Sequence, residues 1–354
     1  MSRMPLLRPT LVPGLARSWR GPRTLQLGAD PNRAVLIDLP DPRGVAVLDL
    51  LDGSRSERAV LTRSSEHGLS AADARELIDT LQAAGFVVPA HTVRPPEPWL
   101  SGEVAALAVG GIPPAAALRS PVPPVSSAPP SLTPAQVLRQ RAASRVSISG
   151  RGRLGAPVAV ALAEAGVGHI HPDLPGAVTA AELPGGPLRG ADIGQARAEA
   201  VGSALIRASP QIETRAVRRG AAALVIQLGY DQPVALLATA HLRRRQPHLA
   251  LAMREGVAAI GPLVPATGRP CLNCLDLHRH ERDPDRAEFL PTSEPCAVTT
   301  VMAAAAFAAA EALTFLDGGT PDTLGATIEI AAAGRFRRRT WHPHADCGCA
   351  RIRR

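Results

Sequence analysis

The first 89 residues contain short apolar runs separated by polar turns. Apolar segments at 24–27 and 34–39 flank a loop of turn-forming residues, which predicts two short strands. Apolar positions spaced three and four residues apart then predict three helices and a closing strand, at 44–51, 56–64, 70–84 and 86–88. This order of elements is typical of a winged helix, so we expect a winged-helix domain at 1–89.

Residues 90–134 differ in composition, because pairs of prolines recur along the segment. Proline lacks a backbone N–H and fixes its own φ, so it is disfavoured inside helices and central strands. We therefore expect a stiff, partly extended linker at 90–134. A short apolar stretch at 104–109 is expected to form a short docked element.

From residue 135 onward, apolar strands alternate with amphipathic helices. A helix at 134–143 is followed by a buried strand at 146–149, a helix at 156–165 and a strand at 167–171. Further helices are expected at 193–208, 234–244 and 297–316, and further strands at 212–217, 222–228, 248–253, 257–264, 324–330 and 335–341. The alternation predicts an α/β domain at 135–354, with a mainly parallel sheet and helices on both faces.

Composition and charge argue against two classes of function. The chain has no lysine, so all 39 basic residues are arginines, and the formal net charge is +8. The arginines are scattered and aromatic residues do not alternate with them, which argues against nucleic-acid binding. The runs 243–245 and 337–339 are interpreted as solvated faces, with contact to an acidic leader or partner as the alternative. No stretch approaches about 18 apolar residues without a charge or a proline, so we expect a cytoplasmic protein outside the membrane.

A glycine-rich turn connects the first strand of the second domain to the next helix. Gly150, Gly152 and Gly155 let backbone N–H groups approach a phosphate at the helix N-terminus. Asp173 follows the next strand, at the place where an acidic side chain meets a ribose hydroxyl. The pattern favours nucleotide binding. An ordinary tight turn and an ordinary surface aspartate are the alternatives.

Four of the five cysteines occur in two close pairs. Cys271 and Cys274 form a CxxC motif, and Cys347 and Cys349 form a CxC motif. Thiolates from two tight turns can form a tetrahedron around Zn²⁺, so we expect a structural zinc knuckle with four cysteine ligands, with two free-thiol turns as the alternative. Nearby histidines, expected at the surface or beside the cysteines without binding the metal, are His278, His280, His342 and His344.

The fifth cysteine, Cys296, immediately precedes the long alanine-rich helix. A helix N-terminus lowers the pKa of a thiol, which would suit a nucleophile that accepts an acyl group. No histidine lies close to it in sequence to act as a base. We therefore favour a small buried residue at the start of the helix and keep the nucleophile as the alternative.

The order of these motifs resembles a known family. The chain resembles the ThiF/MoeB-type fold of enzymes that activate ubiquitin-like proteins. The resemblance rests on the order of a GxGxxG turn, an acidic residue after the next strand, a CxxC and a final CxC. Three strings resemble one branch of this family. They are Gly-Pro-Leu-Val at 261–264, Cys-Leu-Asn-Cys-Leu-Asp-Leu-His-Arg at 271–279 and the following Asp283-Pro284. That branch is the ThiF-like cyclodehydratase component of thiazole/oxazole-modified peptide biosynthesis, also described as a precursor leader-peptide-binding protein. The resemblance implies a Rossmann-like ThiF-type fold, a homodimer and a PqqD-like N-terminal winged helix.

The resemblance also implies an ATP site, from which this sequence departs. Adenylating members use an arginine, a lysine and an aspartate that binds Mg²⁺. The nearest counterparts here are Arg189, Arg197 and Asp231. Arginine keeps the charge of lysine but favours a planar, bidentate partner. We therefore expect a degenerate site for ATP and Mg²⁺, with ATP used by the YcaO-type cyclodehydratase partner that the resemblance implies.

The leading hypothesis is a protein that binds a leader or precursor peptide and presents it to a modifying enzyme, as in bacteriocin biosynthesis. The peptide would add a strand to an exposed sheet edge beside the helix at 70–84. Arg75 is the expected peptide-binding residue, whereas Leu77, Ile78 and Leu81 are assigned mainly to the core. One alternative is an ATP-dependent adenylyltransferase acting on the C-terminus of a small protein or peptide. The other is an NAD(P)-dependent oxidoreductase, which leaves the cysteine pairs unexplained.

Overall fold

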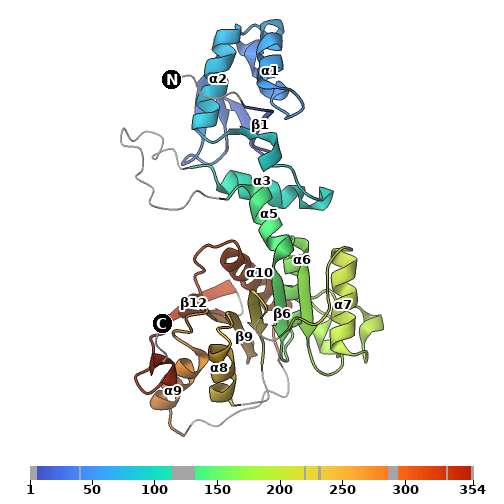
Figure 1. Ribbon diagram of the computed structural model, residues 1–354, viewed down its shortest axis with the longest axis vertical. Coiled ribbons are helices and arrows are strands. Elements are labelled where there is room, and N and C mark those ends of the chain that lie inside the picture. The colour runs from blue at the N-terminus through green and yellow to red at the C-terminus, as the bar shows by residue number, and fades with distance from the viewer. Residues whose placement is uncertain are drawn as a thin grey trace. The chain divides into compact units, whose positions relative to one another are not determined.

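The computed structural model describes residues 6–39, 41–113, 132–218, 221–229, 233–285, 294–331 and 334–351. The chain forms two compact units, Met1–Arg139 and Gln140–Arg354 (Figure 1). Helix α5 (Pro134–Ala143) begins where the second domain is expected to start and continues through the observed division between the units.

The N-terminal unit contains two small antiparallel sheets. β1 (Pro9–Leu11) pairs with β5 (Val87–Pro89). In the second sheet, β3 (Thr24–Leu27) lies between β2 (Arg17–Trp19) and β4 (Val35–Asp38). The two predicted strands are thus present as β3 and β4, while β1 and β2 are too short to have given a clear sequence signal. β2 and β4 are the two edges of the three-stranded sheet.

The three helices expected in this unit are also present, although the first is a 3₁₀ helix. The elements are η1 (Pro42–Leu50), α1 (Glu57–Arg63), η2 (Ser64–His67) and α2 (Ala71–Ala83). Ser56 and Ser70 cap α1 and α2, because each hydroxyl accepts a backbone N–H of the first turn. Leu77, Ile78 and Leu81 of α2 are buried and belong to the core of the unit.

The expected linker contains more regular structure than its prolines suggest. The described part has η3 (Ala90–Thr92), η4 (Pro98–Leu100) and α3 (Ser101–Gly110). Val104 and Ala108 are four positions apart on α3, so both join the core of the N-terminal unit. The apolar stretch at 104–109 therefore lies in a helix that packs on this core, and residues 114–131 lie outside the described part of the chain.

A seven-stranded sheet forms the centre of the C-terminal unit. In chain order its strands are β6 (Arg145–Ser149), β7 (His169–Asp173), β8 (Leu224–Gln227), β9 (His248–Arg254), β10 (Val257–Val264), β11 (Ala326–Ala331) and β12 (Arg335–Thr340). Their spatial order is β12-β11-β10-β9-β8-β6-β7. The strands from β7 to β9 are parallel, and β10, β11 and β12 extend the sheet in antiparallel fashion through the two predicted hairpins.

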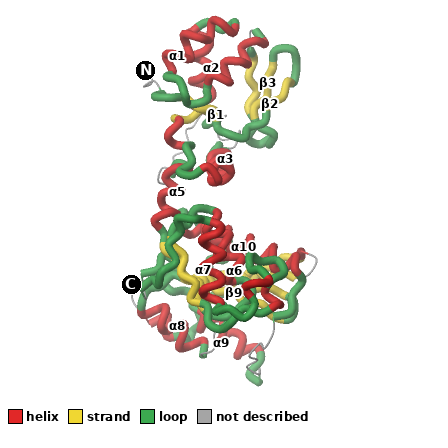
Figure 2. Tube along the Cα trace, turned by 90° about the vertical axis from the view of Figure 1, so that its right-hand side faces the viewer, coloured by secondary structure: helices red, strands yellow, loops and turns green. Residues whose placement is uncertain are grey.

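Helices cover both faces of this sheet (Figures 1 and 2). They are α6 (Gly155–Glu164), α7 (Arg197–Ala208), α8 (Val234–Arg243), α9 (Leu272–Arg282) and α10 (Val298–Leu316). Side chains alternate along β9: Leu249 and Leu251 join the core with α6 and α10, whereas His248 stacks on His241 of α8. The predicted α/β, Rossmann-like architecture is confirmed.

One local prediction for this unit was wrong, and one helix was not predicted. Residues 212–217 form no extended strand, because only Glu213 makes a bridge to β7. Arg215 then folds back and donates its backbone N–H to the Glu213 side chain, which ends the pairing. The segment after the CxxC motif is the helix α9, which was not predicted because most of its residues are polar.

The long helix α10 has the length and apolar composition of a membrane span. In this fold it packs against α6, β10 and β11, and its alanines Ala304, Ala308 and Ala312 are completely buried. Small side chains let it approach α6 closely. α10 is accordingly a core helix of the C-terminal unit.

Candidate functional site

The structure brings the four paired cysteines together. Cys271 is the N-cap of α9 and Cys274 lies in its first turn, while Cys347 and Cys349 come from the C-terminal segment. The Sγ atoms of Cys271 and Cys347 are 3.5 Å apart, and those of Cys274 and Cys349 are 3.4 Å apart. All four sulfur atoms lie within 4.8 Å of one another and all four residues are buried.

These distances fit a tetrahedral zinc site. A Zn–S bond of about 2.3 Å places tetrahedral sulfur atoms ~3.8 Å apart. The Sγ atoms of Cys271 and Cys274 are 3.8 Å apart, and the two closer pairs need to separate only slightly. Leu237 of α8 and Leu272 of α9 pack around the cysteines, so the cluster lies between these two helices.

The thiols of this cluster cannot all ionise together without a cation. The hydrogen bond between Cys271 and Cys274 lowers the pKa of Cys274 to about 4 and raises that of Cys271. Burial raises the pKa of Cys349 to about 12. Neighbouring thiolates repel one another, and a divalent cation removes this repulsion.

Two histidines near the cluster have partners that fix their tautomers. His344 Nδ1 accepts the backbone N–H of Asp346, so Nε2 carries the proton and lies 2.8 Å from Glu281 Oε1. His278 Nε2 lies 3.0 Å from the carbonyl oxygen of His342 and donates to it. With these partners, the two rings connect α9 to the segment before the CxC motif. The side chains of His280 and His342 are exposed.

The glycine-rich turn has the expected strand–turn–helix geometry. Gly150 has φ of +105°, and a Cβ there would lie 2.4 Å from the carbonyl oxygen of Gly229. A Cβ at Gly155, where α6 begins, would lie 2.9 Å from Leu228 Cδ1. The first and last glycines are therefore required by the close packing of the turn against the end of β8.

A carboxylate of the same chain lies against this turn. Glu294 Oε2 accepts the backbone N–H of Arg153 at 2.6 Å, and a Cβ at Gly152 would lie 3.2 Å from Glu294 Oε1. The Arg153 guanidinium donates to the carbonyl oxygens of Glu294, Cys296 and Pro184. Burial is the main cause that raises the pKa of Glu294. Sequence spacing could not reveal Glu294, because 141 residues separate it from Arg153.

The other predicted nucleotide-site residues are only partly assembled around the turn. Asp173 ends β7 beside it: its backbone oxygen accepts from Gly150 N, and its Oδ2 accepts from the Ser149 hydroxyl at 3.0 Å. Arg197 instead forms an ion pair of 2.8 Å with Glu182 and donates to two backbone carbonyls. Arg189 is exposed and contacts Asp192 through its backbone N–H. Asp231 lies outside the described residues.

Cys296 and Arg75 lie in ordinary environments. Cys296 is half-buried against the core of the C-terminal unit, and its Sγ lies 3.5 Å from the Gly256 carbonyl oxygen. Among the described residues, no basic side chain forms a hydrogen bond with this sulfur. Arg75 is exposed on α2. Its position is accessible to a ligand, whereas Leu77, Ile78 and Leu81 are not.

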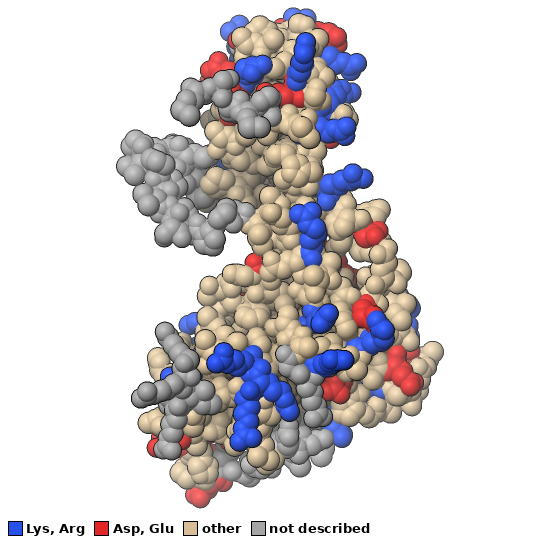
Figure 3. Space-filling view, in the orientation of Figure 1, with Lys and Arg blue, Asp and Glu red and all other residues tan. Residues whose placement is uncertain are grey.

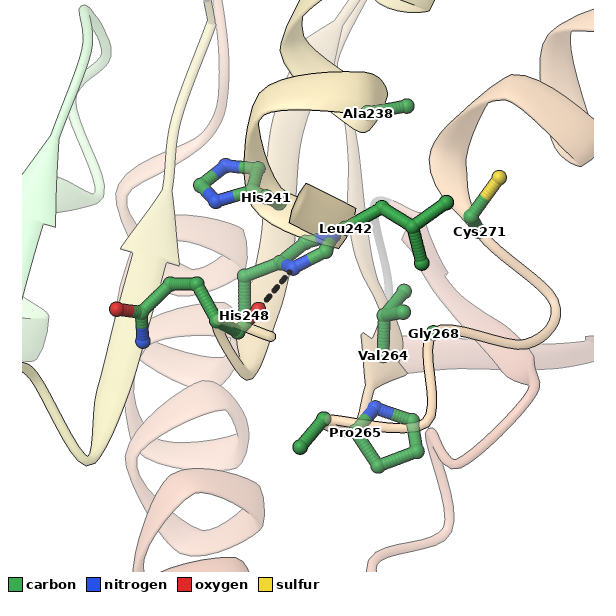
Figure 4. Close-up of a pocket in the computed structure, with 10 residues that line it drawn as sticks. Ala238, His241, Leu242, His248, Val264, Pro265, Gly268 and Cys271 are labelled. Carbon is green, nitrogen blue, oxygen red and sulfur yellow. Dashed lines mark hydrogen bonds between the residues drawn. The ribbon is translucent and has the colours of Figure 1, made fainter. Parts of the chain in front are cut away.

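A buried pair of histidines lies between the central sheet and α8, on the face of the sheet opposite α6 and α10. His241 and His248 stack with ring centroids 4.2 Å apart (Figure 4). His241 Nε2 donates to Gln227 Oε1 and His248 Nδ1 donates to the Gln246 carbonyl oxygen. They line a cavity of about 10 Å³, which is large enough for one water molecule and not for a substrate.

This pair predicts a loss of stability in acid. Burial lowers the pKa of His241 to about 3 and that of His248 to about 4. An unfolded histidine titrates near 6.5, so the unfolded chain takes up protons first and stability is lost as the pH falls below that value. Between pH 7 and pH 5 each ring should cost roughly 2 kcal/mol. Urea unfolding at both pH values checks this. His248→Leu should show a smaller loss, and an equal loss in both proteins contradicts the prediction.

Basic side chains gather on one face of the C-terminal unit (Figure 3). On the edge strand β12, Arg335, Arg337 and Arg338 are exposed. Arg339 is half-buried, because its guanidinium lies 5.6 Å from the ring centre of Trp341 and 3.8 Å from Glu329. At the end of α8, residues 243–245 are also exposed.

A glycine-rich strand–turn–helix and a cluster of four cysteines in one unit define an α/β protein with a Rossmann-like layout. Residues 129–350 match the ThiF family, and the chain belongs to that family. The comparison with curated proteins found no match.

Solved structures resemble this chain over nearly its whole length. Escherichia coli MccB with ATP has a TM-score of 0.66 and 16% identity, covering 96% of this chain and 99% of that one. The microcin C7 biosynthetic enzyme MccB in complex with N-formylated MccA has a TM-score of 0.63, 16% identity and the same coverage. PaaA has a TM-score of 0.62 and 14% identity, covering 93% and 98%. At these identities the likeness establishes a shared fold.

Proposed function

We propose that this protein binds a leader or precursor peptide and presents it to a modifying enzyme. The observation that carries the proposal is the likeness to MccB, which extends over 96% of this chain and therefore includes the N-terminal unit. MccB has been solved in complex with N-formylated MccA. By analogy, we expect a peptide as the ligand here, in a cytoplasmic pathway of the bacteriocin type. The YcaO-type partner and the homodimeric ThiF unit are proposed on the sequence resemblance alone.

The N-terminal unit has features that suit an extended ligand. The three-stranded sheet ends in β2 and β4, whose outer edges pair with no strand among the described residues. Trp19 on β2 and Leu36 on β4 are 44% and 61% exposed, which is unusual for large apolar side chains. An extended peptide can bind either edge through backbone hydrogen bonds. Trp19 is paired with Leu25 of β3 and Leu36 with Gln26, so the two apolar side chains lie on opposite faces of the sheet and each edge offers one of them. The proposed winged-helix domain is the peptide-binding part.

The nucleotide site supports presentation rather than adenylation. The chain has no lysine, and Arg197 is already bound to Glu182 and to backbone carbonyls. A triphosphate would therefore lack one cation that adenylating relatives are expected to provide. We propose a degenerate ATP site and a structural Zn²⁺ held by Cys271, Cys274, Cys347 and Cys349, whose buried sulfur atoms have the required spacing.

Reversing a charge on α2 should weaken peptide binding. The probe is a fluorescent synthetic copy of a candidate precursor peptide, chosen from the short reading frames that neighbour the gene, titrated with the full chain and followed by anisotropy. Arg75→Glu should bind several-fold more weakly, because it reverses a charge at the expected peptide surface. Arg58→Glu, an exposed change on α1, is the matched control and should leave binding unchanged. Equal affinities of the two variants for the peptide would refute the assignment.

An active adenylyltransferase is the second candidate, because the glycine-rich turn keeps its strand–turn–helix geometry. ATP–pyrophosphate exchange separates the two functions. The purified chain with peptide, ATP and Mg²⁺ should show none. Clear exchange by the chain alone would establish the adenylyltransferase instead.

A further inference from the structure

The glycine-rich turn already holds an anion, supplied by Glu294. The carboxylate accepts the Arg153 backbone N–H at 2.6 Å, which is short even for a charge-assisted hydrogen bond. It also lies against Gly152, where a Cβ would be 3.2 Å from Glu294 Oε1 and 3.5 Å from Oε2. Close approach to the backbone of such a turn, at the N-terminus of α6, is the arrangement by which phosphate groups bind.

A second feature of the turn also points to an anion ligand. Arg153 Nε is buried and has no hydrogen-bond partner among the described residues, although both Nη atoms donate to carbonyl oxygens. A buried donor without a partner is costly, and an anion bound next to it would satisfy it. The Glu294 carboxylate makes no hydrogen bond to Nε. One donor of the Arg153 side chain therefore stays unsatisfied while Glu294 occupies the turn.

The surroundings of Glu294 disfavour its charge. Glu182 adds a second carboxylate nearby, although Arg197 compensates for it through their ion pair. Burial and the repulsion from Glu182 raise the pKa of Glu294. The backbone near Glu294 is held independently of its side chain, because Arg153 donates to the carbonyl oxygens of Glu294 and Cys296. The carboxylate can consequently leave the turn by a rotation of its own side chain.

We propose that Glu294 is a built-in competitor for the phosphate site of the glycine-rich turn, so that the polyphosphate of a nucleotide binds only by displacing its carboxylate. Removing the negative charge at residue 294 then strengthens nucleotide binding. This inference rests on the C-terminal unit and does not depend on the proposed peptide function.

The test compares MgATP binding to full-length variants by isothermal titration calorimetry. Glu294→Gln keeps the size of the side chain, and Glu294→Ala removes it. Both should bind MgATP at least about tenfold more tightly than the wild-type protein, because a charge-assisted contact no longer competes. Inorganic tripolyphosphate should show the same gain, since the competition concerns phosphate groups. Glu164→Gln removes an exposed charge at the other end of α6 and should bind like wild type.

Two outcomes overturn the proposal. The first is unchanged or weaker MgATP affinity in both Glu294 variants with unfolding midpoints equal to wild type. The second is that neither the wild type nor any variant binds MgATP or tripolyphosphate. Peptide affinity, measured on the same samples, should be unaffected by Glu294→Gln. A failure of this proposal and a failure of the peptide-binding proposal are thus distinguishable.

Discussion

Cys274→Ser should abolish metal binding and unfold the α8–α9 layer of the C-terminal unit. Cys274 is completely buried, and its Sγ lies within hydrogen-bonding distance of Cys271 and Cys349. A serine oxygen is a poor zinc ligand, so three thiols would remain close together with incomplete coordination. Structural zinc contributes about 10–16 kcal/mol of apparent binding free energy in zinc-finger peptides. Metal analysis should find one Zn²⁺ per wild-type chain and much less in the variant, with loss of cooperative unfolding.

Cys296→Ser is the matched control, because it changes the one cysteine outside the cluster. It should retain full metal content and an unchanged unfolding midpoint. A strong chelator should reproduce the effect of Cys274→Ser in the wild-type protein. Metal-free wild-type protein of normal stability, or a Cys274→Ser variant with full zinc content, would show that the cluster is a group of free thiols.

Asp317→Ala should destabilise the C-terminal unit by about 3–5 kcal/mol. Arg141 of α5 is only 4% exposed and forms a bidentate ion pair with Asp317, with distances of 2.9 Å from Nε to Oδ1 and 2.7 Å from Nη2 to Oδ2. Its Nη1 also donates to the Ala165 carbonyl oxygen. Removing the carboxylate leaves a buried guanidinium whose charge is no longer balanced by Asp317. The midpoint of thermal unfolding should fall by roughly 10 °C.

An exposed ion pair provides the comparison for this variant. Arg215 and Glu213 are 2.6 Å apart, but the Arg215 side chain is 85% exposed. Glu213→Ala should change the unfolding midpoint little, because water solvates both charges. Equal effects of Asp317→Ala and Glu213→Ala would mean that burial of Arg141 does not determine the strength of its pair.

Local sequence patterns predicted the features that depend on neighbouring residues. The strand at 146–149, the glycine turn and the following helix are contiguous, so their apolar spacing and glycines were sufficient. Cysteine spacing predicted the four-cysteine cluster because two short turns can converge on a common point. By contrast, Glu294 contacts Arg153 across 141 residues, and Arg141 pairs with Asp317 across 176. No local periodicity encodes such contacts.

Polar segments were the other source of error. α9 was missed because its buried positions, Leu272, Cys274 and Leu275, are few among charged residues. The strand expected at 212–217 fails because polar groups compete for its backbone. His169 Nε2 contacts the carbonyl oxygen of Arg215, and the Arg215 N–H binds Glu213 instead of a neighbouring strand. Side-chain hydrogen bonds of this kind depend on tertiary placement.

The position of the cysteines in the chain gives the cluster a role beyond its local contacts. Cys271 and Cys347 are 76 residues apart, and Cys274 and Cys349 are 75 apart, so a shared ion would cross-link a large loop that includes α10, β11 and β12. By the loop-closure relation for disulfides, a covalent cross-link of this span removes ~4–5 kcal/mol of chain entropy from the unfolded state. The segment that contains α10, β11 and β12 is therefore cross-linked at both of its sequence ends. Proteolytic cleavage between β12 and the CxC motif would remove this cross-link without cutting any strand of the sheet.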